Sequence, residues 1–504
     1  MITGKKGQYM KQFGIIDLGS NSVRLVLYRE DETGTIQEMD NVKSVLRLSS
    51  HINDRGEIDS EGKEALIECL KRYSQFCKAR AVKIIYGIAT AAIRSASNQS
   101  FLIQEIADET GIIFRVLNGE EEAYYGYLAV INTLAYREAI TVDIGGGSTE
   151  ITYFKDRKLI HSYSFPFGAV TLFQSFREDL SRIKQFVSEQ LSSEKWMMGI
   201  KCPVIVMGGT ARNLARIHQR KINYSLSSLH NYMMNRGDVE ETLHEITEIP
   251  LEKRKEVNGL SKDRIDILPV GLAVFTAVME LVQSSTLITS NKGIRDGFLF
   301  ERILAPNHKV LPDILAYSTE QFMKRYRVNR EHSEHVAEIA IQLFDQLETL
   351  ACHTWGERER ILLRTAALLH DIGRSINVIE STKHTFYLIE NVLLHGVTHR
   401  ERILIGLIAS FKNNRQLVKF ASAHPFITKE DELLALQLGT LVLLARQLDR
   451  NMDQKVQKIE VHPLKKKLAV SLKYEQLQWM EEPIEDSLKK ISKAFARPFS
   501  LSLN

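Results

Sequence analysis

The chain has 504 residues, and its 44% hydrophobic and 25% charged content is that of a globular protein with a large core in about three or four domains. The net charge is only +4, and the four cysteines show no CxxC spacing, which argues against a disulfide framework or a zinc ribbon and fits a reducing compartment. The N-terminal segment lacks the apolar stretch of a signal peptide, and the longest apolar runs are too short to span a bilayer, so we expect a cytoplasmic protein with no membrane partner.

Within residues 1–130, short apolar runs alternate with stretches of helical periodicity. The predicted strands are residues 13–28, 35–49, 82–89 and 112–117. The predicted helices are residues 60–79, 99–110 and 120–135, and Gly111 ends the second of them.

The same order restarts in residues 131–305. The predicted strands are residues 139–143, 150–154 and 204–207, with a turn at 155–158. A helix is expected near 176–195, and helices follow residue 207 to about 305. Strands that alternate with helices predict an α/β fold with mixed sheets. We expect two similar halves around a cleft.

Pro306 and Pro312 mark the next boundary. Residues 306–453 have an almost wholly helical pattern, which predicts an all-α domain. Residues 454–504 differ again, and they predict a small α+β segment. Its elements are a hairpin of 457–462 and 467–472, a helix over 482–495 and a strand over 499–503.

Two glycine-serine loops follow apolar strands at equivalent points of the two halves. They are Asp17-Leu18-Gly19-Ser20-Asn21-Ser22 and Asp143-Ile144-Gly145-Gly146-Gly147-Ser148. Glycine lets the backbone approach a ligand closely, and successive N–H groups in such turns form anion-binding concavities. The residues predicted to bind phosphate are therefore Gly19, Ser20, Asn21, Ser22, Gly145, Gly146, Gly147 and Ser148.

Carboxylates beside these loops offer the oxygen ligands that Mg²⁺ prefers. We predict that Asp17, Asp143 and Glu150 hold this ion. Arg94, which follows a predicted strand, suits a bidentate contact with phosphate. The sequence has no GxxxxGK[ST] motif, which excludes a P-loop NTPase.

Three consecutive carboxylates, Glu120, Glu121 and Glu122, open a predicted helix. Acidic residues favour a first helical turn because of the helix dipole. Hydrolysis of a phosphoanhydride also needs a group that positions the attacking water. The spacing alone leaves open which of the three has that role.

Four segments together resemble the exopolyphosphatase/guanosine pentaphosphate phosphatase family of the actin, sugar kinase and heat-shock chaperone superfamily. They are residues 14–22, 118–123, 142–150 and Phe167-Gly168-Ala169-Val170, and the likeness covers about residues 10–305. The resemblance implies two actin-like (ribonuclease H-like) halves. It also implies Mg²⁺-dependent removal of a terminal phosphate.

The same resemblance carries roles to single residues. The family's catalytic glutamate matches Glu122, its acidic residues in the second loop match Asp143 and Glu150, and its strand-end arginine matches Arg94. One departure is that alanines stand at positions 91 and 92, where the family usually has polar residues before the arginine.

Gly209 and Thr210 follow the predicted strand 204–207. In kinases and chaperones of the superfamily a similar turn packs on adenosine, so both residues are candidate phosphate- or nucleotide-binding residues and an ATP-using protein stays an alternative. A tight turn between strand and helix explains them equally well.

In the helical region, His335, His370, Asp371 and Asp449 resemble in order the ligands of an HD-type phosphohydrolase domain. Histidine nitrogen and carboxylate oxygen suit a borderline divalent metal, so the resemblance implies a second metal site. A buried histidine at a helix end is more often an ordinary core residue. Lys465-Lys466-Lys467 is either a polyanion contact or a solvated strand edge.

The leading hypothesis is an exopolyphosphatase that hydrolyses linear inorganic polyphosphate. The alternatives are a guanosine pentaphosphate 5′-phosphohydrolase that uses the same site and a non-catalytic polyphosphate or nucleotide sensor. The resemblance also implies a homodimer. We expect no nucleic-acid partner.

Overall fold

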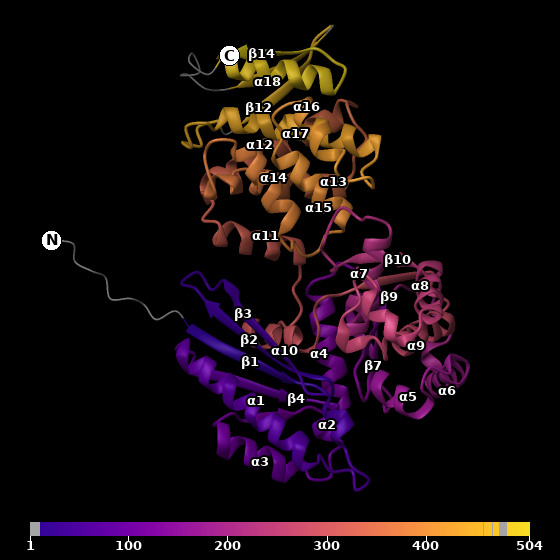
Figure 1. The fold of residues 1–504 in the computed structure, drawn as a ribbon. Coiled ribbons are helices and arrows are strands. Elements are labelled where there is room, and N and C mark those ends of the chain that lie inside the picture. Colours follow the sequence, from indigo (N-terminus) through magenta and orange to yellow (C-terminus); the bar gives the residue numbers. More distant parts are fainter. Residues whose placement is uncertain (1–10, 457, 466, 473–480, 504) are drawn as a thin grey trace, which may run out of the picture. The chain divides into compact units, whose positions relative to one another are not determined.

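The computed structural model describes residues 11–456, 458–465, 467–472 and 481–503, and it divides into two compact units. The first unit extends to Pro312 without Ser225–Ser228 and is α/β. The second unit comprises Ser225–Ser228 and the chain from Asp313 onward, and it is mainly helical (Figure 1). Among the described residues, no helix combines the length and the apolar character needed to cross a bilayer.

The first sheet has the strand order β3-β2-β1-β4-β5. β1 to β3 form an antiparallel meander, and β4 and β5 run parallel to β1. The strands are β1 (Lys11–Leu18), β2 (Ser22–Glu30), β3 (Ile36–Val45), β4 (Ile84–Ala89) and β5 (Phe114–Val116). The helices are η1 (Leu48–His51), α1 (Ser60–Ala79), α2 (Ala91–Arg94) and α3 (Gln99–Thr110). α1 and α3 agree with their predicted bounds, and Gly111 ends α3 in the left-handed conformation that favours glycine.

The second sheet has the strand order β10-β11-β9-β6-β7-β8. Its strands are β6 (Glu138–Ile144), β7 (Thr149–Lys155), β8 (Lys158–Phe165), β9 (Val204–Met207), β10 (Tyr232–Asn235) and β11 (Thr286–Thr289). β6 to β8 form an antiparallel meander, and β9 and β11 continue parallel to β6. Apart from the added β10, this order repeats that of the first sheet. The predicted α/β fold with two similar halves is confirmed.

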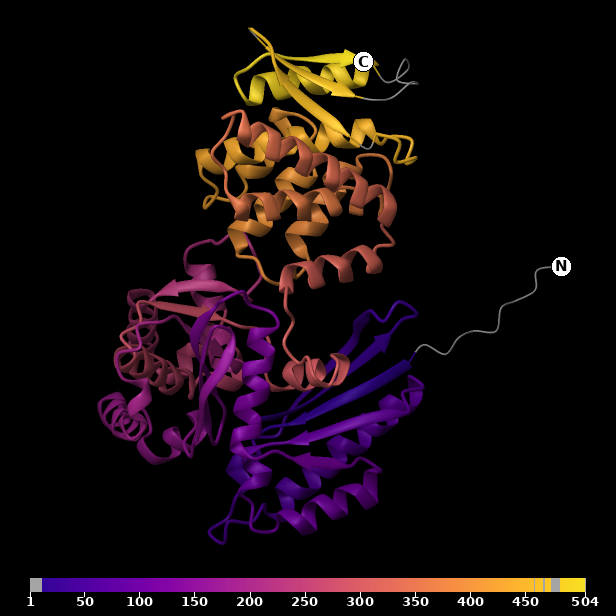
Figure 2. The same ribbon diagram turned by 180° about the vertical axis from the view of Figure 1, so that it is seen from behind.

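Helices cover the second sheet and separate the two sheets. They are α4 (Gly119–Ile131), α5 (Ala169–Phe176), α6 (Leu180–Ser192), η2 (Lys195–Met197), α7 (Gly208–Lys221), α8 (Arg236–Glu248), η3 (Leu251–Glu256), η4 (Lys262–Arg264), α9 (Leu268–Leu281) and α10 (Ile294–Ile303). α4 runs between the sheets and packs against α10 (Figures 1 and 2). Leu128 of α4, Met207 of β9 and Phe298 of α10 belong to one apolar cluster with Ile15 of β1, which joins the halves.

The helix expected near 176–195 is present as α6. Two other predictions about local structure are wrong. The expected strand 13–28 divides into β1 and β2 at the first glycine-serine loop. The stretch after residue 207, expected to be helical, contains β10 and β11. Each of these strands has four residues, which is too short to show a period of two against the surrounding helices.

The second unit contains a bundle of helices. They are α11 (Ile314–Arg325), α12 (Arg330–Thr349), α13 (Glu357–Leu368), η5 (Ile372–Ser375), α14 (Ser381–Asn391), α15 (His399–Ala409), α16 (Asn414–Ala421), α17 (Lys429–Leu448) and α18 (Glu481–Ala494). α17 packs against α12, α13, α15, α16 and α18. The predicted helical region is confirmed.

A small sheet ends the second unit. β12 (Ile459–Pro463) pairs antiparallel with β13 (Leu468–Leu472), and β14 (Phe499–Leu503) pairs parallel with β13 after α18. The predicted hairpin, helix and last strand are therefore confirmed. Lys466 of the lysine run lies outside the described residues.

Candidate active site

A cavity of about 530 Å³ lies between the two sheets, where the glycine-serine loops meet. It is lined by residues of both halves, which is the cleft that the repeat predicted. The predicted site residues on its wall are Asp17, Gly19, Ser20, Asn21, Ser22, Glu122, Asp143, Gly145, Gly146, Ser148, Glu150 and Gly209. Arg94, Gly147 and Thr210 are not on that wall.

The two loops form the same turn. The Gly19 N–H donates to the Ser22 carbonyl at 3.1 Å, and the Gly145 N–H donates to the Ser148 carbonyl at 2.9 Å. The loops also touch, because a Cβ at Gly146 would lie 2.8 Å from the Ser20 Cβ. Glycine at position 146 therefore lets the two loops close on one cavity.

The structure distinguishes the three glutamates at the start of α4. Glu120 is exposed. Glu121 completes a capping box with Asn118, whose N–H donates to the Glu121 carboxylate at 2.9 Å. Glu122 is 3% exposed and lines the cavity. Of the three, Glu122 alone has its carboxylate in the cleft.

Arg94 contacts this glutamate rather than the cavity. Its guanidinium forms an ion pair with the Glu122 carboxylate and donates to the Leu117 carbonyl at 2.9 Å. Arg94 is therefore placed to orient Glu122.

Two further carboxylates on the cavity wall lie side by side. Asp143 and Glu150 are register partners in β6 and β7. The Ser164 hydroxyl donates to Glu150 Oε1 at 2.9 Å. Burial raises the pKa of Asp143 to about 6 and that of Glu150 to about 7. A buried carboxylate pair is costly unless a cation neutralises it.

Asp17 has a different environment. Its register partner is Arg24 in β2. Burial raises the pKa of Asp17, and the positive charges of Arg295 and Arg24 oppose this shift. Arg212 and Arg264 oppose the shift of Asp143 in the same way, so the two aspartates differ mainly in their register partner.

The sequence analysis missed a group of cations on the cavity wall. They are Arg24, Lys43, Arg212, Arg216, Arg264, Lys292 and Arg295. The Arg264 guanidinium lies against Gly209 with no room for a Cβ there. Thr210 is fully buried against Gly271, so it packs α7 against α9. Single arginines in helices and strands carry no spacing signal, and no motif of the sequence singled them out.

Two family models match the chain. The model of the Ppx/GppA phosphatase family matches residues 26–305, and the model of Ppx/GppA phosphatase, domain III, matches residues 314–489. The chain belongs to the Ppx/GppA phosphatase family. The predicted family is thereby confirmed, and the helical unit is the region that matches domain III of Ppx/GppA phosphatases.

Solved structures of the family have the same α/β fold as the first unit. A Ppx/GppA family member from Aquifex aeolicus is 28% identical, and the match covers 60% of this chain and all of that one with a TM-score of 0.51. An exopolyphosphatase from Cytophaga hutchinsonii is 22% identical, and the match covers 58% of this chain and 98% of that one with a TM-score of 0.54.

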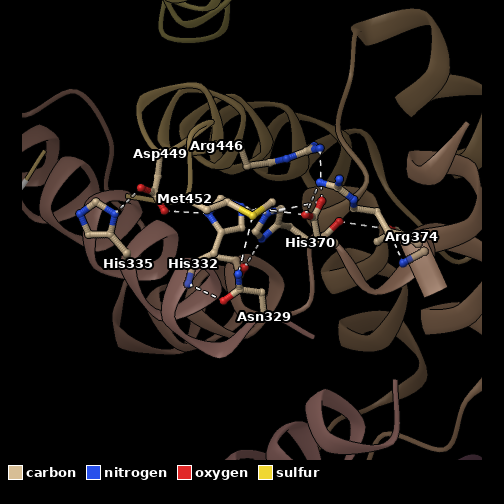
Figure 3. A network of polar contacts seen from close by, with 12 residues as sticks. Asn329, His332, His335, His370, Arg374, Arg446, Asp449 and Met452 are labelled. Carbon is tan, nitrogen blue, oxygen red and sulfur yellow. Dashed lines mark hydrogen bonds and ion pairs between the residues drawn. The ribbon is translucent and has the colours of Figure 1, made fainter. Parts of the chain in front are cut away.

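The helical unit of this Ppx/GppA phosphatase holds a second cluster of polar side chains (Figure 3). His332, His370 and Asp371 place one ligand atom each within 4.8 Å of one another. Asp449 lies behind His332, because its Oδ2 is 2.7 Å from His332 Nδ1. Three of the four residues predicted for a second metal, His370, Asp371 and Asp449, thus lie together.

His335 is not part of the three-residue group. Its Nδ1 faces Asp449 Oδ1 at 3.2 Å, and its Nε2 bonds to the Val456 carbonyl at 2.9 Å. His332 occupies the place predicted for His335. Both histidines lie in α12, three residues apart. Which of them faces His370 depends on the direction in which each side chain leaves the helix, and the order of residues along the sequence does not show this.

Proposed function

We propose that the chain is an exopolyphosphatase, which removes the terminal phosphate of linear polyphosphate by attack of water. The observation that carries this proposal is the position of Glu122 on the wall of a cavity rich in cations and backbone donors. A carboxylate repels phosphate, so a site that only bound phosphate would gain nothing from it. Hydrolysis needs such a group to position the attacking water.

Each part of the cavity wall has one task in this proposal. The N–H groups of Ser20, Asn21, Gly146 and Gly147, with the loop hydroxyls, hold the terminal and penultimate phosphates. The arginines spread the negative charge of the chain that follows. Glu122, oriented by Arg94, accepts a proton from the water that attacks the terminal phosphorus.

The residues fit Mg²⁺ beside Asp143 and Glu150, with Asp17 as the third predicted ligand. The donors are oxygen atoms, as Mg²⁺ prefers, and the buried pair of Asp143 and Glu150 calls for a cation. When bound, Mg²⁺ would neutralise charge that develops on the phosphate oxygens. Asp17, which Arg24 and Arg295 already neutralise in part, would contribute least to this ion.

Replacement of the proposed water-positioning group tests the proposal. Glu122→Gln should lower phosphate release from long polyphosphate by about 10²–10⁴-fold, the usual contribution of such a group. Polyphosphate binding should remain, because the loops and the arginines are untouched. The matched control is Glu120→Gln, in the same helical turn but exposed, which should keep full activity.

Retained turnover in Glu122→Gln would remove Glu122 from the mechanism. Binding of polyphosphate without phosphate release by the unaltered chain, with Mg²⁺ or Mn²⁺, would favour the sensor. Production of ADP that depends on an acceptor would favour the ATP-using alternative.

Long polyphosphate and guanosine pentaphosphate both present a terminal phosphoanhydride to the same loops. We place polyphosphate first because the cavity wall carries cations outside the two loops, among them Lys43 and Arg216, which suits a long polyanion. The test is kcat/KM for the two substrates side by side, and a higher value for guanosine pentaphosphate would reverse the order. The homodimer and the cytoplasmic location stay predictions, and sedimentation and cell fractionation test them.

A further inference from the structure

Helix α7 leaves one line of arginines uncovered. Nine of its 14 residues are buried. The residues that are not buried are Gly208, Arg212, Arg216 and Arg220, at intervals of four, and Lys221 at the end. Because residues four apart share one face of a helix, Arg212, Arg216 and Arg220 form a continuous line, which we call the α7 arginine stripe.

The α7 arginine stripe leads from the candidate active site to the surface. A Cβ at Gly208 would lie 2.6 Å from Asp143 Oδ1, so the helix begins beside a proposed metal ligand. Arg212 and Arg216 line the cavity, whereas Arg220 is exposed and is not on the cavity wall. With a rise of about 1.5 Å per residue, the distance along the helix from Gly208 to Arg220 is about 18 Å.

The two outer arginines of the stripe are held by neutral groups. Arg216 Nη1 donates to the Gly259 carbonyl at 3.2 Å, and Arg220 donates to the side-chain oxygen of Asn258. These contacts orient the guanidinium groups without cancelling their charge. Lys221, in contrast, pairs with two carboxylates of helix α8 at 2.9 and 2.7 Å. The positive charge of the stripe is therefore available to an anionic ligand.

Strand β3 also contributes to the cavity wall, but it suits a polyanion less. Its wall residues are Glu38, Asn41 and Lys43. Lys43 Nζ already lies 2.7 Å from Asp263 Oδ2. The Glu38 carboxylate, which accepts from Asn41 Nδ2 at 2.9 Å, repels a chain of phosphates. Of these two elements, α7 is the one along which a long polyanion can leave the cavity.

We propose that the α7 arginine stripe binds the part of a linear polyphosphate that follows the reacting end. Guanidinium groups suit this role because each can donate two hydrogen bonds to one phosphate. The proposal rests on the proposed function, which places the terminal phosphate at the glycine-serine loops. Tripolyphosphate held at those loops is too short to reach Arg220 at the far end of about 18 Å of helix, whereas a long chain reaches it.

Binding measured in the Glu122→Gln background tests the stripe apart from the reaction. Arg220→Gln should lower the affinity for long polyphosphate by about two- to fivefold relative to the affinity for tripolyphosphate, as loss of one exposed charge contact implies. Arg216→Gln should weaken the binding of long polyphosphate by about 10–100-fold, because its guanidinium is half-buried on the cavity wall. The slope of log Kd against log salt concentration should fall by about one for each arginine removed.

Lys221→Gln is the matched control. It removes the next exposed cation of the same helix, which Glu241 and Glu245 already neutralise. The ratio of the two affinities and the salt dependence should remain those of the Glu122→Gln parent. An unchanged ratio in Arg220→Gln, or an equal fall in Lys221→Gln, overturns the proposal.

Failure of the stripe and failure of the proposed function give different results. If the unaltered chain releases no phosphate, the hydrolase is wrong, and a loss of long-chain affinity in Arg220→Gln still supports the stripe. If the unaltered chain releases phosphate and Arg220→Gln binds both substrates as its parent does, the hydrolase stands and the stripe is wrong.

Discussion

The two glycine-serine loops share one backbone and differ in chemistry. Each closes an antiparallel pair of strands with the same hydrogen bond from glycine to serine. The strand register then places Arg24 opposite Asp17 in the first half and Glu150 opposite Asp143 in the second. At one equivalent position, a cation in the first half is exchanged for an anion in the second.

This exchange separates the tasks of the halves. In the first half, Arg24 opposes the charge of Asp17. In the second half, Glu150 adds to the charge of Asp143, although Arg212 and Arg264 oppose it, so this half is the better place for a cation. A duplicated fold can therefore place opposite charges at one register position, and the following predictions test that asymmetry.

The largest effect is expected on the second loop. Glu150→Gln should lower phosphate release by about 10²–10³-fold, the scale seen when one group that stabilises transition-state charge is lost. Asp17→Asn, which removes the carboxylate of the first loop, should cost about tenfold or less. Rates at saturating Mg²⁺ for both variants check this, and equal losses would contradict the asymmetry.

The next effect concerns the partner of Asp17. Arg24→Gln should lower kcat/KM by about 10–100-fold, because a charged hydrogen bond contributes about 1.5–3 kcal/mol. The loss should appear mainly in KM, since the side chain binds substrate rather than metal. A Mg²⁺ titration of the same variant supplies the control, and its midpoint should not move.

Lowering the pH should weaken the binding of Mg²⁺ by Asp143 and Glu150. Metal ligands must be deprotonated, and burial raises the pKa of Asp143 to about 6 and of Glu150 to about 7. The Mg²⁺ concentration for half-maximal activity should therefore rise roughly tenfold or more per pH unit below pH 6 and level off above pH 8. Mg²⁺ titrations from pH 5 to 8 measure it. A midpoint that does not depend on pH would remove these carboxylates from the metal site.

The smallest effect is on stability. Because the folded-state pKa values of Asp143 and Glu150 lie above the usual 3.8 and 4.5, the folded state holds these protons more tightly than the unfolded chain. Without metal, their contribution to stability is greatest below about pH 4 and is lost as the pH rises to about 7. Millimolar Mg²⁺ should raise the Tm by a few degrees at pH 8 and hardly at pH 5. Calorimetry with and without Mg²⁺ at pH 5 and pH 8 checks whether the Tm rises mainly at the higher pH.

The parts of the site that sequence could predict are those that repeat or occupy a fixed local spacing. The two loops repeat. Asn118 and Glu121 have the spacing of a capping box, which accounts for one of the three adjacent carboxylates. Glu122 needed the family resemblance, because nothing local shows which carboxylate faces the cleft.

The remaining parts depend on tertiary packing. Arg212 and Arg264 meet at the cavity from elements far apart in the sequence, and neither carries a motif. His332 and Asp449, in contact at 2.7 Å, are separated by 117 positions. The α/β fold with mixed sheets was predictable because short apolar runs alternate with helices, whereas four-residue strands such as β10 and β11 were not.

Helix α4 precedes the second half along the chain but packs on its sheet, against β6, β7 and β8. Gly119 in its first turn lies against Ser164, and the Ser164 hydroxyl binds Glu150. Glu122 and Glu150 therefore both lie on elements in or packed on the second sheet. The first glycine-serine loop, in contrast, joins two strands of the first sheet. The spacing of Glu122 and Glu150 is therefore set within one half, whereas the position of the first loop relative to them depends on how the two sheets pack, including the contact of Gly146 with Ser20.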